Sequence, residues 1–324
     1  MKTFVVINPH SANRETGKRW AETRAKLRRA LGNFGEEFTS RPMHATQIAA
    51  HAIKDGYDCI VAAGGDGTLN EVVNGFFEGG KPINPEAVLG VIPLGTGGDF
   101  RRTFGWGVDL QSSLARLEGT GTVPMDLGML EYTAHSGEQS TRLFANVCSF
   151  GVSGLVDREV NQTSKMLGGR LSFLIGTAKA LLKYKDQTVE LSIDGKPSEE
   201  ARITTLAVAN GQYFGGGMCV APEAAPADGF FDVTVWAGYA LGDFIFKAKA
   251  LYDGSHVKLP GTRCFRCRTL SAASAQEVLL DVDGEQPGRL PCRLTILPGA
   301  IRLKVGNERS ARSSEPLGPG RASV

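Results

Sequence analysis

A glycine-rich turn at residues 64–68 is the most informative stretch of the sequence. It reads Gly64-Gly65-Asp66-Gly67-Thr68, follows the apolar run Ile60–Ala63 and precedes a helix-like pattern. Glycines at a strand-to-helix junction let backbone amides turn toward an anion, and the helix N-terminus adds partial positive charge. A carboxylate at Asp66 would repel phosphate unless a metal ion lies between them. The turn therefore predicts a site for a metal–nucleotide complex, whereas the same residues by themselves could form a simple tight turn.

Two more turns of this kind follow apolar runs in the first 125 residues. They are Asn8-Pro9-His10-Ser11 and the segment 93–99, which reads Pro93-Leu94-Gly95-Thr96-Gly97-Gly98-Asp99. Short apolar strands alternate here with helical patterns, and this alternation predicts a doubly wound, mostly parallel α/β sheet. Ligands bind such sheets beyond the carboxyl ends of the strands, so we expect the three turns to converge. The predicted strands are Thr3–Ile7, Glu37–Thr39, Asp58–Ala63 and Val88–Pro93, and the predicted helices are Glu15–Leu31, Ala45–Lys54 and Thr68–Phe77.

After about Met125 strand-like segments follow one another directly, which predicts a mainly antiparallel β-sandwich with helical insertions. Helical patterns cover Leu155 to about Lys185 and roughly Leu241–Asp253. We expect an α/β domain at 1–125, to which 298–306 returns, a β-rich domain at 126–297 and a disordered polar tail at 307–324. The predicted strands are Met125–Thr133, Thr141–Ser149, Thr188–Ile193, Ala201–Ala209, Phe230–Trp236, Cys264–Ala272, Glu277–Asp283 and Cys292–Leu297.

Composition and charge set broad limits on function. The 324 residues are 42% hydrophobic and 22% charged, as in ordinary globular proteins, and suggest two domains. The net charge of +2 is too small to argue for a nucleic-acid partner. The start of the chain reads as a buried strand rather than a secretory signal, and no apolar run is long enough to span a bilayer. We therefore expect a cytoplasmic protein that at most touches a membrane surface.

Several familiar site motifs are excluded. The glycine spacing after Gly64 does not fit the dinucleotide-binding fingerprint, and no glycine loop carries a Walker lysine. Cys264 and Cys267 have the CxxC spacing but no second pair, and on a strand the two thiols would point to opposite faces. The sequence does not favour zinc or redox chemistry there.

In these motifs the chain resembles the lipid kinases related to diacylglycerol kinase and sphingosine kinase. The resemblance is to the bacterial type within the NAD kinase/diacylglycerol kinase superfamily. The resemblance runs from about Lys2 to Lys304. It rests on Asn8–Ser11, the loop 64–71, Pro93–Thr96, the segment 227–232 and Asp283-Gly284-Glu285. The first loop is shared with NAD kinases and phosphofructokinases. Its continuation Leu69-Asn70-Glu71 and the two late motifs favour the lipid branch.

The resemblance implies a two-domain, ATP- and Mg²⁺-dependent kinase with its active site in the cleft between the domains. The implied catalytic residues are Glu285, as the general base, and Asp66, which would lie near the phosphates and their metal ion. Asp228 would bind Mg²⁺, helped by the backbone carbonyls of Ala225 and Phe230. The residues implied to contact ATP are Asn8, Ser11, Thr39, Gly64, Gly65, Asp66, Gly67, Thr68, Asn70 and Thr96.

Elementary chemistry supports these roles. Phosphoryl transfer needs positioning, charge neutralisation and a base for the acceptor hydroxyl, and a carboxylate can be that base if it reaches the proton. Glu285 follows the turn Asp283-Gly284 at the end of an apolar strand, where it could be exposed at a cleft. Glu285 could equally be a solvated hairpin residue, and Asp228-Gly229 could be only a turn.

One position departs from the family pattern. The second loop of the family usually reads Gly-Thr-x-Asn-Asp-Phe, whereas here Gly98 stands in the place of the asparagine. A side-chain amide is lost, which could loosen a nucleotide or acceptor contact unless water replaces it.

The sequence leaves three functions open. The first is transfer of phosphate from ATP to a lipid hydroxyl, with diacylglycerol as the expected type of acceptor at a membrane surface. The second is a kinase for NAD or another small molecule, and the third is a lipid-binding regulatory protein with weakened catalysis. The basic amphipathic stretch Lys165–Lys185 suits either a membrane surface or packing on the second domain. The lipid and the oligomeric state, a homodimer included, stay open.

Overall fold

The computed structural model describes residues 1–156, 184, 186–239 and 241–307. Its contacts divide the chain into two compact units. The first comprises Met1–Asp126 together with the chain from Pro298 on, and the second comprises Leu127–Leu297. The predicted helix around Leu155–Lys185 and the predicted tail lie almost entirely outside the described residues.

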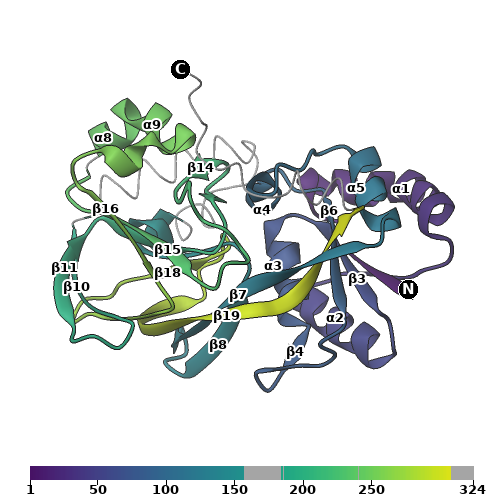
Figure 1. Ribbon diagram of the computed structural model, residues 1–324, viewed down its shortest axis with the longest axis horizontal. Helices are drawn as coiled ribbons and strands as arrows, with labels where there is room; N and C mark the ends of the chain where they lie inside the picture. Colours follow the sequence, from purple (N-terminus) through teal and green to yellow (C-terminus); the bar gives the residue numbers. More distant parts are fainter. Residues whose placement is uncertain (157–183, 185, 240, 308–324) are drawn as a thin grey trace. The chain divides into compact units, whose positions relative to one another are not determined.

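The first domain alternates strands and helices along the chain (Figure 1). Each buried strand is a short apolar run that ends at glycine, proline or a polar turn, and the helices between them carry apolar residues on one face. The elements are β1 (Thr3–Ile7), η1 (Ala12–Arg14), α1 (Glu15–Leu31), β2 (Gly35–Phe38), α2 (His44–Lys54), β3 (Cys59–Gly64), α3 (Asp66–Asn74), β4 (Phe77–Glu78), β5 (Lys81–Pro82), β6 (Val88–Pro93), α4 (Asp99–Thr103) and α5 (Leu110–Glu118).

The main sheet of this domain is parallel, in the order β2-β1-β3-β6. The end of β19 (Gly288–Gly306) runs parallel to β6, where Arg302 pairs with Val88. On one face of the sheet, Val5 and Val61 pack with Trp20 of α1 and Leu114 of α5 in one core. Because the strands are in register at their carboxyl ends, the turns that follow β1, β3 and β6 leave the sheet at the same edge.

In the described part of the second domain the strands pair antiparallel. One sheet has the order β16-β15-β12-β9-β18. The other set of paired strands has the order β11-β10-β17-β19, with β7 paired to both β19 and β8. The elements are β7 (Gly121–Ala134), β8 (Gln139–Phe144), β9 (Val147–Gly151), β10 (Gln187–Ile193), β11 (Glu199–Ile203), β12 (Thr205–Ala209), β13 (Tyr213–Phe214), β14 (Met218–Cys219), β15 (Phe231–Trp236), α8 (Leu241–Phe246), α9 (Ala248–Asp253), η3 (Ser255–Lys258), β16 (Thr262–Cys267), β17 (Thr269–Ala273), β18 (Leu280–Val282) and β19 (Gly288–Gly306).

Both sets of strands bury their inner faces in one core. Phe150 and Val233 come from one sheet, Val189 and Leu294 come from the other, and all four are almost completely buried. The rings of Phe144 and Phe231 stack in this core, with centroids 5.7 Å apart. The predicted architecture, a parallel α/β domain followed by an antiparallel β-rich domain, is confirmed.

The strand boundaries in the second domain needed correction. The predicted strand Thr141–Ser149 is two strands, β8 and β9, which separate at Ala145-Asn146. The carboxylate of Asp283 accepts hydrogen bonds from the backbone N–H groups of Ala145, Asn146 and Val147, so it takes the place of a neighbouring strand there. The predicted strands Ala201–Ala209 and Cys264–Ala272 are likewise each divided in two, at Thr204 and Arg268.

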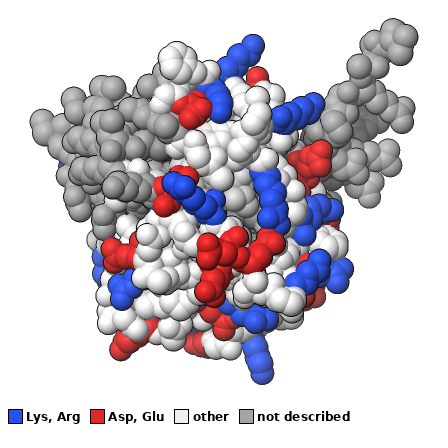
Figure 2. Space-filling model, turned by 90° about the vertical axis from the view of Figure 1, so that its left-hand side faces the viewer, with Lys and Arg blue, Asp and Glu red and all other residues white. Residues whose placement is uncertain are grey.

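The surface charge, the helices and the cysteines can be compared with what the sequence predicts about nucleic-acid binding, membrane spans and zinc or redox sites. In the face drawn in Figure 2, acidic side chains gather near the centre with basic ones around them, so the described surface there carries both signs of charge. Among the described residues, no helix combines the length and the apolar composition needed to cross a membrane. Within β16, Cys264 is exposed and Cys267 is buried, as expected for thiols on opposite faces of a strand.

Candidate functional site

Three turns meet at the carboxyl edge of the parallel sheet. In the first turn, the Asn8 backbone N–H donates to the Ala63 carbonyl at 3.0 Å, and the Asn8 amide Nδ2 donates to Thr68 Oγ1 at 3.0 Å. The Leu94 N–H of the third turn donates to the Gly64 carbonyl at 2.7 Å. The hydrogen bonds thus fasten the first and third turns to the middle one, so the structure brings these predicted segments together.

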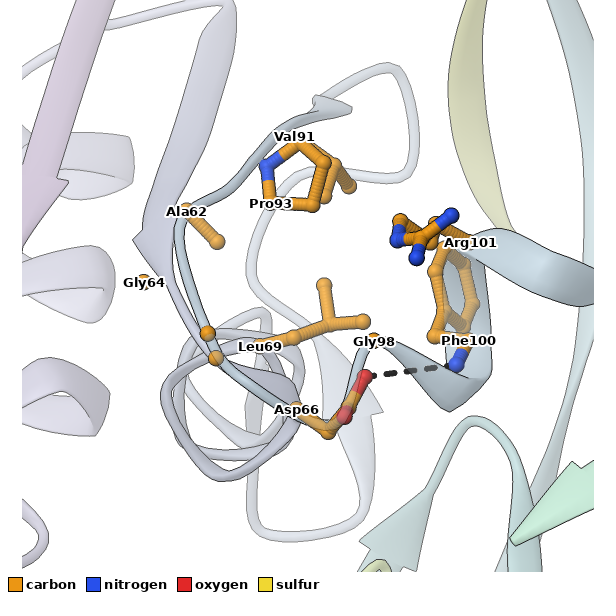
Figure 3. Close-up of a pocket in the computed structure, with 11 residues that line it drawn as sticks. Ala62, Gly64, Asp66, Leu69, Val91, Pro93, Gly98, Phe100 and Arg101 are labelled. Atoms are coloured by element: carbon orange, nitrogen blue, oxygen red, sulfur yellow. Dashed lines mark hydrogen bonds between the residues drawn. The ribbon is translucent and has the colours of Figure 1, made fainter. Parts of the chain in front are cut away.

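A small pocket opens between the second and third turns (Figure 3). Its floor and walls come from the ends of β3 and β6, the first turns of α3 and α4, and the glycines that connect these elements. In Figure 3, Phe100 and Arg101 lie on one side, and Ala62 and Gly64 on the other. The residues that line it are Ala62, Gly64, Gly65, Asp66, Leu69, Val91, Pro93, Gly95, Gly98, Phe100 and Arg101.

The second and third turns approach each other closely at Gly65 and Gly95, which explains why these two positions lack side chains. A Cβ built on Gly95 would lie 2.4 Å from the Cα of Gly65, which is backbone and could not move aside alone. Any larger residue at Gly95 would therefore push the two turns apart. Such contact between bare backbones leaves amide groups near the pocket, which suits an anionic ligand.

The carboxylate of Asp66 caps the next helix. Its Oδ2 accepts a hydrogen bond from the Asp99 N–H, and its Oδ1 accepts one from the Phe100 N–H, both at 3.2 Å. These donors are among the first N–H groups of α4, which have no partner within their own helix. Asp66 therefore joins the second turn to the third, and its negative charge is partly balanced by backbone dipoles.

Gly98 adopts a backbone conformation that explains the departure from the family pattern. Its φ of 65° and ψ of 39° are left-handed, a region that glycine enters freely and asparagine more readily than most residues. Exchange of asparagine for glycine therefore preserves the loop. A Cβ at Gly98 would lie 2.6 Å from Nε of Arg101, so the Arg101 side chain fills the space that a side chain at 98 would need.

The remaining residues predicted to contact ATP lie around the same edge with different exposure. Thr39 follows β2 and is buried, with its N–H donated to the Ile7 carbonyl at 2.8 Å. Ser11 donates from Oγ to the Asn8 carbonyl at 2.9 Å, which closes the first turn. Asn70 is fully buried within α3, whereas Thr96 is exposed and does not line the pocket. Asn70 thus supports the loop from inside.

Glu285 lies in the second domain on a tight turn. The Glu285 N–H donates to the Val282 carbonyl at 3.0 Å, and both central residues, Asp283 and Gly284, have positive φ. Asp281 fixes the turn from below, since its Oδ1 accepts the Gly284 N–H at 2.9 Å. The turn is therefore anchored by two carboxylates, which leaves the position of Glu285 well defined.

A buried arginine contacts Glu285. Arg142 of β8 donates from Nη2 to Oε2 of Glu285 at 3.2 Å, and the Arg142 side chain is 9% exposed whereas that of Glu285 is 46% exposed. A guanidinium held in this way orients a carboxylate while the rest of the carboxylate stays accessible. Sequence reasoning missed Arg142 because it lies 143 residues from its partner.

The predicted metal ligand Asp228 is exposed and forms an ion pair with Arg266. Nε of the same arginine lies 3.5 Å from Oδ2 of Asp232, whose side chain is 14% exposed. Burial raises the pKa of Asp232 to about 6, against the lowering effect of Arg266, and the nearby Asp228 charge raises it further. Two carboxylates therefore share one arginine at this position.

A magnesium ion at this position would need oxygen ligands from these residues. The described residues contain no group of three or more His, Cys, Asp or Glu side chains arranged to hold a metal. Asp232 Oδ2 is buried, accepts no hydrogen bond and lies 3.5 Å from Nε of Arg266, and with Asp228 it offers the oxygen donors that Mg²⁺ prefers. The predicted ligand Ala225 already accepts backbone N–H groups from Ala227 and Asp228, at 2.7 and 3.3 Å. The carboxylate oxygens are thus of the type that suits the ion, whereas Arg266 contacts both of them and the Ala225 carbonyl is engaged in its own turn.

Two family models match the chain in succession. The model described as diacylglycerol kinase catalytic domain matches residues 2–130. The model described as YegS C-terminal NAD kinase beta sandwich-like domain matches residues 146–305. The two matches follow the two domains of the structure.

Similar proteins and structures cover almost the whole chain. The diacylglycerol kinase of Staphylococcus saprophyticus subsp. saprophyticus is 28% identical over 305 residues, which are 94% of this chain and 95% of that protein. That of Staphylococcus aureus strain MRSA252 is 29% identical over 306 residues, 94% of this chain and 92% of the relative. A crystal structure of a diacylglycerol kinase from Bacillus anthracis str. Sterne has a TM-score of 0.67 at 20% identity and covers 94% of this chain and 96% of its own. An NAD kinase from Archaeoglobus fulgidus in complex with ATP has a TM-score of 0.50 at 14% identity, with 96% of both chains covered.

Proposed function

Since the chain belongs to the bacterial diacylglycerol kinase family, which shares its fold with NAD kinases, we propose that it transfers the γ-phosphate of ATP to the hydroxyl of a lipid. Family membership supports a phosphotransferase. The names of the curated relatives favour a diacylglycerol-like acceptor, and the product would be a lipid phosphomonoester.

The junction of the three turns in the first domain is the observation that carries this proposal most. Bare glycine backbone at Gly65 and Gly95, the N-terminus of α3 and the Arg101 guanidinium converge on one pocket. Such a set of donors binds phosphate groups. We propose that this pocket and the turns around it hold the nucleotide phosphates.

Glu285 supplies the base in this proposal. A general base must reach the proton of the attacking hydroxyl while it stays ionised. Arg142 engages Oε2 and so orients the carboxylate, and Oε1 would then accept the proton. The shared location of Glu285 and the nucleotide turns in one cleft remains a prediction.

Asp228 and Asp232 would hold Mg²⁺ in the second domain, with the Phe230 carbonyl as a third oxygen ligand. When bound, the ion would neutralise negative charge on the phosphates. Arg266 holds both carboxylates in the structure and would have to release Asp228 to make room for the ion. Asp66 is engaged with α4, so we assign it to the positioning of the second and third turns.

The direct test is a phosphoryl-transfer assay with radiolabelled ATP and a panel of acceptors. The panel contains diacylglycerol, phosphatidylglycerol, sphingosine and ceramide in mixed micelles, and NAD in solution. Label in the diacylglycerol product, lost in Glu285→Gln, supports the proposal. Label in NAD alone would replace it with an NAD kinase activity, which the fold likeness to NAD kinases keeps open. Lipid binding with no transfer would indicate a regulatory protein.

A further inference from the structure

The guanidinium of Arg101 is a cation in the wall of the nucleotide pocket that sequence reasoning did not assign to the site. Arg101 is the third residue of α4, and its side chain lines the pocket (Figure 3). Nη1 donates to the Trp106 carbonyl at 2.9 Å, which ties one end of the guanidinium to the protein. The remaining donors of this group are available to a ligand.

The charges around the pocket single out Arg101. Its neighbour Arg102 lies 3.7 Å from Asp99, and the Asp66 carboxylate is occupied by two backbone N–H groups. Within the described part of the chain, Arg101 has no carboxylate at ion-pair distance. Burial, followed by repulsion from Arg102, lowers the pKa of its side chain. A partly desolvated cation without an ion-pair partner in a pocket of backbone amides is suited to bind an anion.

The absence of a side chain at Gly98 gives Arg101 its place. A Cβ at Gly98 would lie 2.6 Å from Nε and 3.3 Å from Cδ of Arg101. A residue with a side chain at 98 would therefore displace the arginine from its observed position. The glycine and the arginine form a matched pair, in which the loss of an amide at 98 makes room for a guanidinium from 101.

We propose that Arg101 binds the polyphosphate of the nucleotide and takes over the donor role of the side chain missing at Gly98. The proposal rests on the proposed function, because it assigns the pocket to a nucleotide. It assigns Arg101 to the phosphates and not to the adenine or to the acceptor.

Calorimetric binding to the full-length protein tests this. The probes are ATP, adenosine and inorganic tripolyphosphate, and the variants are Arg101→Met, Arg101→Lys and, as a charge-matched control, Arg302→Met. Arg302 lies on β19 and pairs with Glu86 at 3.0 Å, away from the pocket. We expect Arg101→Met to weaken ATP and tripolyphosphate binding about 10- to 100-fold, as for loss of a charged hydrogen bond, with adenosine unchanged. Arg101→Lys should recover part of the loss, and Arg302→Met should bind as the wild type does.

A further variant protects the test against a general loss of structure. Gly98→Asn in the Arg101→Met background restores a donor at 98 once the arginine no longer blocks it, and should regain ATP affinity. Equal loss of adenosine and ATP binding in Arg101→Met, unchanged ATP binding, or no binding of ATP and tripolyphosphate by the wild type would each overturn the inference. Wild-type protein that binds ATP through Arg101 but phosphorylates no acceptor of the panel would instead refute the proposed kinase function.

Discussion

Replacement of Asp66 by alanine separates the structural role of this carboxylate from a catalytic one. The substitution removes the acceptor of two hydrogen bonds, from the Asp99 and Phe100 N–H groups, each at 3.2 Å. Loss of a helix cap of this kind destabilises a protein by about 1–2 kcal/mol. Since a native domain has a free energy of unfolding of about 5–15 kcal/mol, the fold should survive in Asp66→Ala. Phosphoryl transfer should be abolished, because the second turn no longer holds the start of α4, although the Leu94 N–H still donates to the Gly64 carbonyl.

Hydrogen exchange measured by mass spectrometry reports this change locally. A loss of about 1–2 kcal/mol predicts amide exchange about 5- to 30-fold faster in a peptide that spans residues 95–104, if the opening is local. A peptide from α2, which carries none of these bonds, should exchange as before. The matched control is Asp109→Ala, which removes the cap of α5 that accepts the Ser112 N–H at 2.7 Å. The control should speed exchange in α5 and leave residues 95–104 unchanged.

The outcome for Asp66→Asn decides between the two roles. Asparagine keeps one acceptor oxygen, so Asp66→Asn should lose only about half of the free energy that protects the amides of residues 95–104 from exchange. Full transfer activity in Asp66→Asn would assign the residue to positioning alone, and loss of activity with protection retained would show that its charge is needed. Unchanged exchange at 95–104 in Asp66→Ala would refute the capping argument itself.

Three further predictions concern Glu285, Asp232 and Gly98. Glu285→Gln should lower kcat about 100- to 10,000-fold with ATP affinity intact, and Arg142→Met should lower it less; equal losses, measured by steady-state kinetics, would contradict a purely orienting Arg142. Burial raises the pKa of Asp232 to about 6, so the folded protein favours the protonated carboxyl. The contribution of this carboxyl to the free energy of unfolding is therefore complete below the ordinary carboxyl pKa and is lost as the pH rises through about 6. In urea unfolding between pH 4 and 8, the free energy of unfolding of the wild type should therefore fall by about 1–2 kcal/mol relative to that of Asp232→Asn. The same pH dependence of this free energy in both proteins would contradict the prediction. Gly98→Ala should destabilise the first domain by about 1–2 kcal/mol, since alanine disfavours a φ of 65°, and Gly98→Asn should destabilise it less in thermal unfolding.

The first domain could be predicted closely because its strands are continuous buried runs with clear ends. β1 and β6 have the predicted bounds, and α1 covers Glu15–Leu31 as predicted. In a parallel sheet both faces are covered, so the hydrophobic signal is strong and ends sharply at glycine or proline. The same regularity allowed the convergence of the three turns to be predicted, because parallel strands place their carboxyl ends together.

The second domain was less predictable because side chains interrupt its strands. No local pattern in Thr141–Ser149 indicates that the chain bends at Ala145, since the cause is the Asp283 carboxylate far along the sequence. Arg142 and Asp232 were missed for a similar reason. A charged residue in an alternating strand reads as solvent-facing, and only the tertiary partner reveals that it is buried. Arg101 was not assigned to the site, although its position shortly after a glycine turn was the available signal.

The sequence argument placed a metal ion next to Asp66, because a carboxylate in a phosphate cradle needs a positive neighbour. The structure offers a different neighbour, since the N–H groups of Asp99 and Phe100 meet that need. Asp66 therefore needs no metal ion of its own to balance its charge, and the cation of the pocket wall is Arg101. Asp228 and Asp232, where burial leaves an oxygen without a hydrogen bond, then become the stronger candidates for Mg²⁺. A consequence is that Asp228→Ala should weaken the dependence of activity on Mg²⁺ more than Asp66→Asn does, and the reverse order in a magnesium titration would restore the metal to Asp66.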